Sequence, residues 1–136
     1  MTPSLAPALH RAVHAIALSL DRSLGDLTQA EAHVLVHLAA SGPSTVGQLH
    51  REFGHRRSTL TSVLDRLEGR GHVRRELNPA DRRTFTIVPT AAGKKAGGRA
   101  RAALEQIESA ALAGTSDADV AAFRRVLERI EAGARG

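Results

Sequence analysis

Residues 45–93 read TVGQLHREFGHRRSTLTSVLDRLEGRGHVRRELNPADRRTFTIVPTAAG. Thr45 and Gln48 have the Thr-x-x-Gln spacing of a capping box, in which two side chains bond to backbone N–H groups at the start of a helix. The helix that follows is short, because Gly54 suits the left-handed conformation in which helices commonly end. The stretch therefore opens with one short helix.

A second helix is predicted from about Arg56 to Glu68, and its two faces differ in character. One face is apolar and consists of Leu60, Val63, Leu64 and Leu67. The opposite face is small, hydroxyl-bearing and partly charged, and it consists of Ser58, Thr59, Thr61, Ser62, Asp65 and Arg66. Ser and Thr can bond to base edges or phosphates at close approach, and Arg can bind guanine through two hydrogen bonds. Arg56 and Arg57, at the amino end of this helix, are placed to reach phosphates.

A charged β-hairpin is predicted to follow the second helix. Two β-like runs, 73–77 and 84–88, are separated by Asn78-Pro79-Ala80-Asp81-Arg82-Arg83, which is rich in turn-forming residues. The tip places Asp81 beside two arginines. One arginine can enter a minor groove, where narrow A·T tracts concentrate negative potential, while Asp81 pairs with the other and fixes its direction. A simple surface turn with an ion pair is the less favoured interpretation.

Helices are also predicted on the amino-terminal side of this stretch. Residues 4–20 place apolar side chains three and four apart, which is the period of one helix face, and we expect the loop around Gly25 to close this helix. Thr28 and Glu31 have capping-box spacing, and apolar residues follow at helical spacing until Gly42 and Pro43. Two helices therefore precede the short one.

Two further helices are predicted on the carboxyl-terminal side. Thr90 can cap a long helix, whose start contains Gly93, Gly97 and Gly98 and is therefore expected to bend or to pack closely against a neighbour. Ser116 can cap a last helix, whose apolar face consists of Val120, Phe123, Leu127 and Ile130.

Positive charge is concentrated in the decisive stretch. Residues 51–101 contain thirteen Lys or Arg and five Asp or Glu, a net charge of +8, whereas the rest of the chain contains six and nine, a net charge of −3. Charge that served only solubility would be spread more evenly, so this block indicates a surface that binds a polyanion. The only aromatic residues are three phenylalanines, too few for base-stacking platforms, and duplex DNA is the favoured partner.

Length and composition are those of one ordinary globular domain. The chain has 136 residues, of which 42% are hydrophobic and 24% charged, and no cysteine. No apolar run is long enough for a membrane-spanning helix, and the amino terminus lacks a signal-peptide pattern, so we expect no membrane partner and a cytoplasmic location. The motifs of phosphate-binding loops, zinc proteases and serine hydrolases are absent, and we expect neither catalysis nor a cofactor.

The order of three helices and a charged hairpin predicts a mainly α fold with a small β-hairpin wing, the winged helix-turn-helix. At this point the sequence resembles the MarR (multiple antibiotic resistance regulator) family of bacterial transcription regulators. The resemblance covers roughly residues 27–95, and its motifs are Leu27-Thr28, Thr45-Val46-Gly47-Gln48-Leu49, Ser58-Thr59-Leu60-Thr61, Leu64-Asp65-Arg66-Leu67-Glu68 with Gly71, Asp81-Arg82-Arg83 and Thr90-Ala91-Ala92-Gly93.

The resemblance implies a homodimeric, ligand-responsive repressor that reads a pseudo-palindrome in duplex DNA. Residues 1–26 and 100–136 would form the helical dimerisation region, residues 27–99 the winged DNA-binding domain, and a small-molecule effector would bind near their junction. Base and phosphate contacts would come from Ser58, Thr59, Thr61, Ser62 and Arg66, and the wing contact from Arg82, with Asp81 and Arg83 in support. The absence of cysteine excludes effector sensing by thiol oxidation.

Two alternatives stay open. A winged-helix module can dock an acidic protein partner through the same basic face, since a fold does not by itself name a function. A metal-responsive regulator is the other, because His10 and His14, and also His33 and His37, stand four apart, the spacing at which two imidazoles can share one metal ion. No cysteine completes such a set, and we assign no metal ligand.

Overall fold

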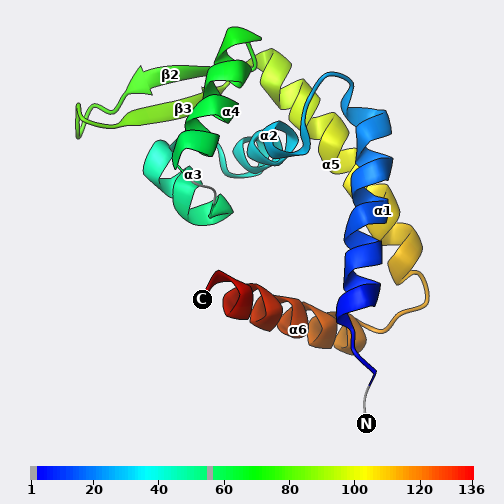
Figure 1. Cartoon of the computed structure of the whole chain (residues 1–136). Coiled ribbons are helices and arrows are strands. Elements are labelled where there is room, and N and C mark those ends of the chain that lie inside the picture. The colour runs from blue at the N-terminus through cyan, green and yellow to red at the C-terminus, as the bar shows by residue number, and fades with distance from the viewer. Residues whose placement is uncertain (1–2, 55–56) are drawn as a thin grey trace. The chain divides into compact units, whose positions relative to one another are not determined.

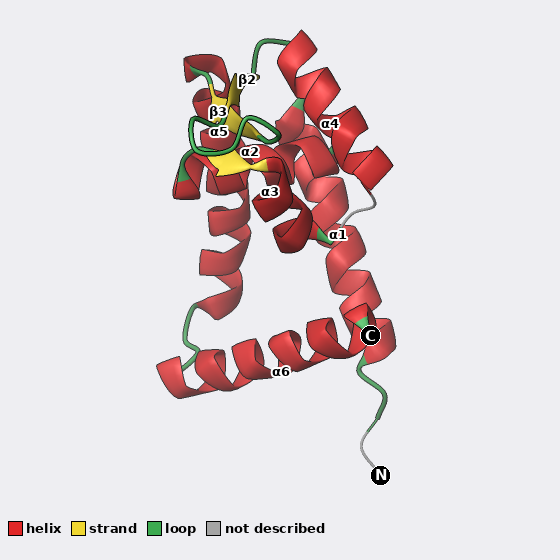
Figure 2. Ribbon diagram, turned by 90° about the vertical axis from the view of Figure 1, so that its left-hand side faces the viewer, coloured by secondary structure: helices red, strands yellow, loops and turns green. Residues whose placement is uncertain are grey.

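The computed structural model describes residues 3–54 and 57–136, which form six helices and three short strands (Figures 1 and 2). In chain order these are α1 (Ala6–Leu24), α2 (Gln29–Ser41), β1 (Ser44–Thr45), α3 (Val46–Phe53), α4 (Arg57–Gly69), β2 (Val73–Leu77), β3 (Phe85–Pro89), α5 (Ala91–Leu112) and α6 (Asp117–Arg135). Contacts divide the chain into two units, one ending at Leu104 and one beginning at Glu105. The mainly helical fold with a hairpin wing is as predicted.

The first helix ends where the sequence predicts. The loop around Gly25 was expected to close it, and α1 ends at Leu24. Leu20 and Leu24 are both buried, against Ala32 of α2 and Ala100 of α5. This tertiary contact stabilises the last turn of α1, which lies beyond the apolar period of residues 4–20.

The two predicted capping boxes differ in outcome. In α3 the box is complete, since Gln48 N–H donates to Thr45 Oγ1 at 3.1 Å and Thr45 N–H donates to Gln48 Oε1 at 2.8 Å. In α2 only half of it forms: Glu31 N–H donates to Thr28 Oγ1 at 3.2 Å. The Glu31 carboxylate instead bonds to α4. The predicted start of the helix at Thr28 is confirmed, with one of the two bonds of a capping box.

The strands form one antiparallel sheet in the order β1-β3-β2. In the hairpin Val73 pairs with Pro89 and Leu77 with Phe85. The second strand starts and ends one residue later than the predicted range of 84–88. The strand β1 was not predicted, because two residues carry no alternating pattern and pair with β3 only in the folded chain.

The main core lies under the helix-turn-helix and the wing. The apolar face predicted for α4 is buried there, together with residues of α2, α3, β2, β3 and α5. Its most buried members are Val34, Leu35, Leu38, Leu49, Leu60, Val63, Leu64, Leu67, Val73 and Ile87, each at most 2% exposed. Since burying one such side chain contributes roughly 1.5 to 3 kcal/mol, this core fixes α4 and the wing in one body.

The start of α5 packs closely against its neighbours, as its glycines predict. A Cβ at Gly93 would stand 1.9 Å from the carbonyl oxygen of His72, and one at Gly97 would stand 2.7 Å from that of Leu35. Thr90 caps this helix by accepting a hydrogen bond from Gly93 N–H at 3.1 Å. Gly98 has open space around it, so only two of the three glycines are required by packing.

The second unit contains the end of α5 and all of α6. Ser116 caps α6 by accepting a hydrogen bond from Asp119 N–H at 3.1 Å, as predicted. No residue of α6, all of which the structure describes, is buried. Its exposed large apolar side chains form one stripe, Phe123, Val126, Leu127 and Ile130.

Candidate nucleic-acid interface

The outward face of α4 carries short polar side chains. Ser58, Thr59, Thr61 and Ser62 are all exposed, opposite the buried leucines of the same helix, so the predicted division of α4 into two faces is confirmed. Small side chains let a helix approach the floor of a groove about 12 Å wide. Arg57 is the first residue of α4, and Arg56 lies outside the described residues.

Two of these serines are bonded to each other along the helix. Ser62 Oγ donates to the backbone oxygen of Ser58 at 3.0 Å, which uses the Ser62 hydroxyl hydrogen. Its oxygen lone pairs remain outward, where they can accept from the amino groups of adenine or cytosine. At this position of the face, Ser62 thus acts mainly as a hydrogen-bond acceptor toward DNA.

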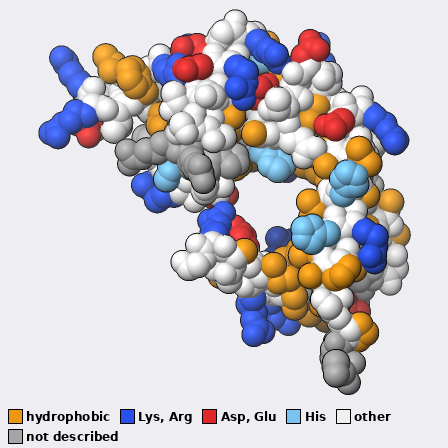
Figure 3. Space-filling view, viewed as in Figure 1, with side chains coloured by type: hydrophobic (Ala, Val, Ile, Leu, Met, Phe, Trp, Pro, Cys, Tyr) orange, Lys and Arg blue, Asp and Glu red, His pale blue; other side chains and the backbone are white. Residues whose placement is uncertain are grey.

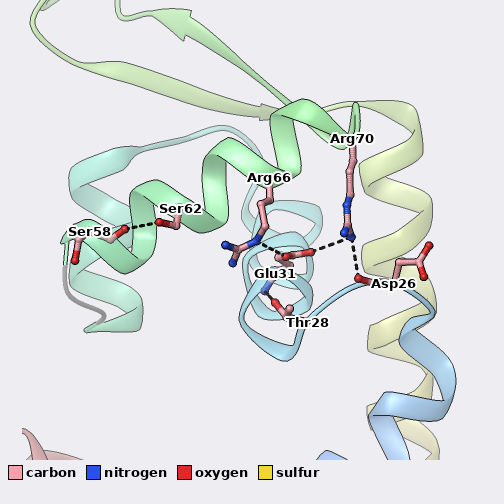
Figure 4. A network of polar contacts seen from close by, with 7 residues as sticks. All are labelled: Asp26, Thr28, Glu31, Ser58, Ser62, Arg66 and Arg70. Atoms are coloured by element: carbon pink, nitrogen blue, oxygen red, sulfur yellow. Dashed lines mark hydrogen bonds and ion pairs between the residues drawn. The ribbon is translucent and has the colours of Figure 1, made fainter.

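Arg66 shares the polar side of α4 but is bonded within the protein. Its Nε donates to Oε1 of Glu31, at 2.8 Å, and Glu31 is fully buried on α2 (Figure 4). The Arg66 side chain is nevertheless 46% exposed. The sequence placed Arg66 correctly on the outward face and missed its partner, which lies 35 residues away in the chain.

The hairpin tip is shaped by hydrogen bonds of Asp81. Its Oδ1 accepts from Arg83 N–H at 3.0 Å, and its backbone oxygen accepts from Thr84 N–H at 3.1 Å. The predicted pairing with one arginine is present, at 3.8 Å from Arg83 Nε, although Arg83 is 95% exposed and the pair is weak. Within the described part of the chain Arg82 has no ion pair or hydrogen bond of its side chain, and it is exposed. Asp81 therefore holds the tip in shape and leaves Arg82 outward.

A three-residue ion-pair cluster joins the wing to α4. Arg75 of β2 donates to Asp65 at 2.7 Å and to Glu68 at 2.9 Å, and Arg75 N–H also donates to Glu68 at 3.1 Å. Burial alone would lower the pKa of Arg75, but its hydrogen bonds to Asp65 and Glu68 and the charges of both carboxylates raise it above its ordinary value. Arg75 therefore stays charged, and its bonds to Asp65 and Glu68 hold the wing against α4. No sequence signal indicated the cluster, because the three residues meet only across two elements.

A groove opens between α3, α4 and the loop end of the wing. It has a volume of about 610 Å³, and its walls include Val46, His50, Arg51, Thr61 and Phe85 together with Gly47, Leu60, Arg83 and Thr84. His50 and Arg51 were not among the predicted contacts. Their signal in the sequence is their position in the last turn of the short helix, directly before Gly54.

Positive side chains on the surface are prominent at the free end of the wing. Lys and Arg side chains extend from the free end of the β2–β3 hairpin in the space-filling view (Figure 3). Arg74 and Arg75, in contrast, are bonded to acidic side chains within the chain, Arg74 to Glu76 at 2.8 Å. Those two arginines therefore contribute less to an anion-binding surface than a count of charges implies.

The histidine pairs do not assemble a metal site in the described part of the chain. His10 and His14 are exposed on α1, and His37 packs edge-on against Phe53 with ring centroids 5.6 Å apart. Among residues 3–54 and 57–136 there is no group of three or more His, Cys, Asp or Glu arranged to hold an ion. In the same residues no helix has the length and apolar character needed to cross a membrane.

Comparisons with known proteins agree with this geometry. Residues 25–84 match the sequence model described as the MarR family. A curated relative, an uncharacterized HTH-type transcriptional regulator, YcgE, of Bacillus subtilis (strain 168), is 45% identical over 58 residues, which are 43% of this chain and 38% of that protein. The match thus spans well under half of the relative's length.

Solved structures extend the likeness to nearly the whole chain. A MarR variant from E. coli complexed with operator DNA has a TM-score of 0.76 and 22% identity, covering 93% of this chain and 92% of that one. BpsR of Bordetella bronchiseptica, whose DNA binding is regulated by 6-hydroxynicotinic acid, has a TM-score of 0.74 and 23% identity, covering 93% and 98%. At these identities the structures establish the fold. Residues 25–84 carry the MarR-family sequence, and the chain has the winged helix-turn-helix fold of MarR transcriptional regulators over nearly its whole length.

Proposed function

We propose that this chain forms a homodimeric, ligand-responsive repressor that binds a pseudo-palindromic operator in duplex DNA. As a MarR-type regulator it is not an enzyme. The observation that carries the proposal is the joint placement of two features on one body: the exposed hydroxyl face of α4 and the outward Arg82 of the wing, joined through Arg75, Asp65 and Glu68. A repressor of genomic DNA acts in the cytoplasm of a bacterium.

The helix α4 enters the major groove in this proposal. Ser58, Thr59, Thr61 and Ser62 contact base edges or phosphates, and Arg66 contacts guanine. Arg56 and Arg57 contact phosphates at the amino end of the helix. These contacts sort into base reading and backbone positioning, and only the first group carries sequence specificity.

The wing enters the neighbouring minor groove. Arg82 is the inserted side chain, with Asp81 and Arg83 in support, and narrow A·T-rich flanks are the preferred sequence there. The groove between α3, α4 and the wing then holds the sugar–phosphate strand that separates the two DNA grooves. Arg51 and Arg83 in its walls suit phosphates, His50 can add a hydrogen bond, and Val46 and Phe85 suit deoxyribose.

Dimerisation is assigned to residues 1–26 and 100–136, and DNA binding to residues 27–99. Both ends of the chain carry unpartnered apolar surface: Leu5, Val13 and Leu18 on or beside α1, and the stripe of α6. Large apolar side chains exposed at helical spacing mark protein interaction surfaces, and a two-fold dimer buries each twice. A second copy is therefore the occupant of these surfaces.

Effector binding is placed near the junction of the dimerisation and DNA-binding regions. The support is the fold shared with BpsR, whose DNA binding responds to 6-hydroxynicotinic acid. An effector of this chain acts by binding the DNA-competent and DNA-incompetent dimers with different affinity.

Selection from a randomised duplex library tests the proposal. The dimer should enrich an inverted repeat whose half-sites lie about 10 bp apart, centre to centre, because its two α4 helices are set one turn of DNA apart. Affinity for the selected duplex should fall steeply with salt concentration. A protein that enriches no sequence and is not retained on any duplex at low salt would instead be a protein-docking module.

A further inference from the structure

Glu31 is an unusual residue for the interior of a helix-turn-helix. It lies on α2, is fully buried, and belongs to a residue type that is almost never buried without a partner. Only the backbone N–H of Glu31 takes part in the cap, where it donates to Thr28. The carboxylate points away from Thr28 and toward α4 (Figure 4). Its position thus requires a different explanation.

Two arginines pair with this buried carboxylate: Arg66 of α4, and Arg70, which directly follows the end of α4 at Gly69. Oε1 accepts from Arg66 Nε at 2.8 Å, and Oε2 lies 3.5 Å from Arg70 Nη1. Arg70 Nη1 also donates to the backbone oxygen of Asp26, at 2.8 Å, in the segment between α1 and α2. Arg70 is therefore shared with the backbone, and the short direct bond of Glu31 is the one to Arg66.

The bond to Glu31 uses one particular nitrogen of Arg66. A guanidinium can bind guanine through Nε with one Nη, or through its two Nη groups. Because Nε already donates to Glu31, the second mode alone remains. The Arg66 side chain is half-exposed and stands in line with Ser58 and Ser62, at four-residue steps along α4.

We infer that Glu31 is a positioning residue for base recognition: from the buried side of α4 it holds Arg66 so that its two Nη groups face guanine in the major groove. The inference rests on the proposed function, because it requires α4 to lie in that groove. An arginine fixed before binding has fewer rotamers to lose on contact, and its direction selects one base edge. Glu31 thereby sets sequence preference without touching DNA.

Base preference in the randomised duplex selection separates positioning from simple stability. The wild-type chain should prefer guanine at one symmetric position of each half-site, and Arg66→Met should erase that preference, which for a bidentate contact is about 5- to 150-fold. Glu31→Met, which keeps the volume but removes both oxygens, should remove most of this guanine preference while other positions keep their preference. Glu31→Gln, which keeps an acceptor, should be intermediate.

Arg70→Met is the matched control, since it removes the other arginine beside Glu31 and leaves the Arg66 bond in place. It should retain the guanine preference. The inference is overturned if Glu31→Met keeps the preference that Arg66→Met erases, or if Arg66→Met alters no position. In either case a wild-type chain that still selects an inverted repeat leaves the proposed function standing, whereas a wild type that selects nothing removes the proposed function itself.

A measurement on the wild-type chain covers the case in which the Glu31 variants do not fold. In nitrogen-15 spectra the Arg66 Nε–H signal should exchange slowly with water, both free and bound to the selected duplex. A signal that exchanges rapidly, or that loses its protection on binding DNA, would show that the bond to Glu31 does not hold during recognition and would overturn the inference.

Discussion

Replacing Gly93 by Ala inserts one methyl group where the start of α5 meets the segment between α4 and β2. The added Cβ would stand 1.9 Å from the His72 carbonyl oxygen and 2.9 Å from its carbon, whereas real Cβ contacts essentially never fall below 3.0 Å. Both neighbours are backbone atoms and cannot turn aside. The two segments must therefore separate by about 1 Å, as in other overpacked sites.

The free-energy change is the balance of three contributions. Overpacking costs about 1 to 3 kcal/mol, and the hydrogen bond from Thr90 N–H to His72 O, 3.0 Å long, is stretched and loses part of its roughly 0.5 to 1.5 kcal/mol. Alanine gains up to about 1 kcal/mol over glycine inside a helix. Gly93→Ala should thus lower the free energy of unfolding by about 1 to 3 kcal/mol.

Gly98→Ala is the matched control, since it lies in the same helix with nothing within 4 Å of its added Cβ. It should raise stability by up to about 1 kcal/mol. Thermal denaturation at one fixed protein concentration should show a fall of roughly 3 to 10 °C for Gly93→Ala and a small rise for Gly98→Ala. Equal melting temperatures for the two variants would refute the close approach of α5 to His72.

Three further changes test other parts of the account. Arg82→Ala should weaken binding to the selected duplex by about 1 to 3 kcal/mol in gel-shift titrations, most with A·T-rich flanks, and unchanged affinity would reject the wing contact. Arg75→Gln should lower the free energy of unfolding by roughly 1 kcal/mol in urea denaturation, because it leaves two carboxylates side by side. Arg74→Gln, in a more exposed pair, should lower it little, and equal losses would contradict the cluster. Phe123→Asp should raise the dimer dissociation constant at least tenfold in sedimentation equilibrium, with Arg125→Ala as control, and an intact dimer would remove α6 from the interface.

Local chemistry made most of this fold predictable from the sequence. The capping residues Thr45 and Ser116 and the end of α3 at Gly54 act within one turn of chain, so their patterns lead directly to structure. The four buried residues of α4 share a helical period, which also identified its outward face. Capping residues and helical periods depend on residues a few positions apart, so they can be recognised in the sequence alone.

Contacts between distant segments were the part that the sequence did not disclose. In the sequence, Glu31 has the spacing of a capping residue. Its partner Arg66 lies on α4, which packs beside α2 only in the folded chain. In the sequence, Arg75 looks like one more exposed cation. In the structure β2 lies beside α4, and Arg75 donates to Asp65. Glu31 and Asp65 thus pair with two of the arginines near the candidate interface. The positive charge left to bind DNA is smaller and more localised than the composition suggests.

Hydroxyl-radical footprinting of the chain on its selected duplex is the most direct test of the central claim, that two copies place α4 and a wing on one DNA molecule. The account predicts two protected regions related by two-fold symmetry, about 10 bp apart from centre to centre, appearing together as protein concentration rises. A single protected half-site, or protection without symmetry, would contradict it.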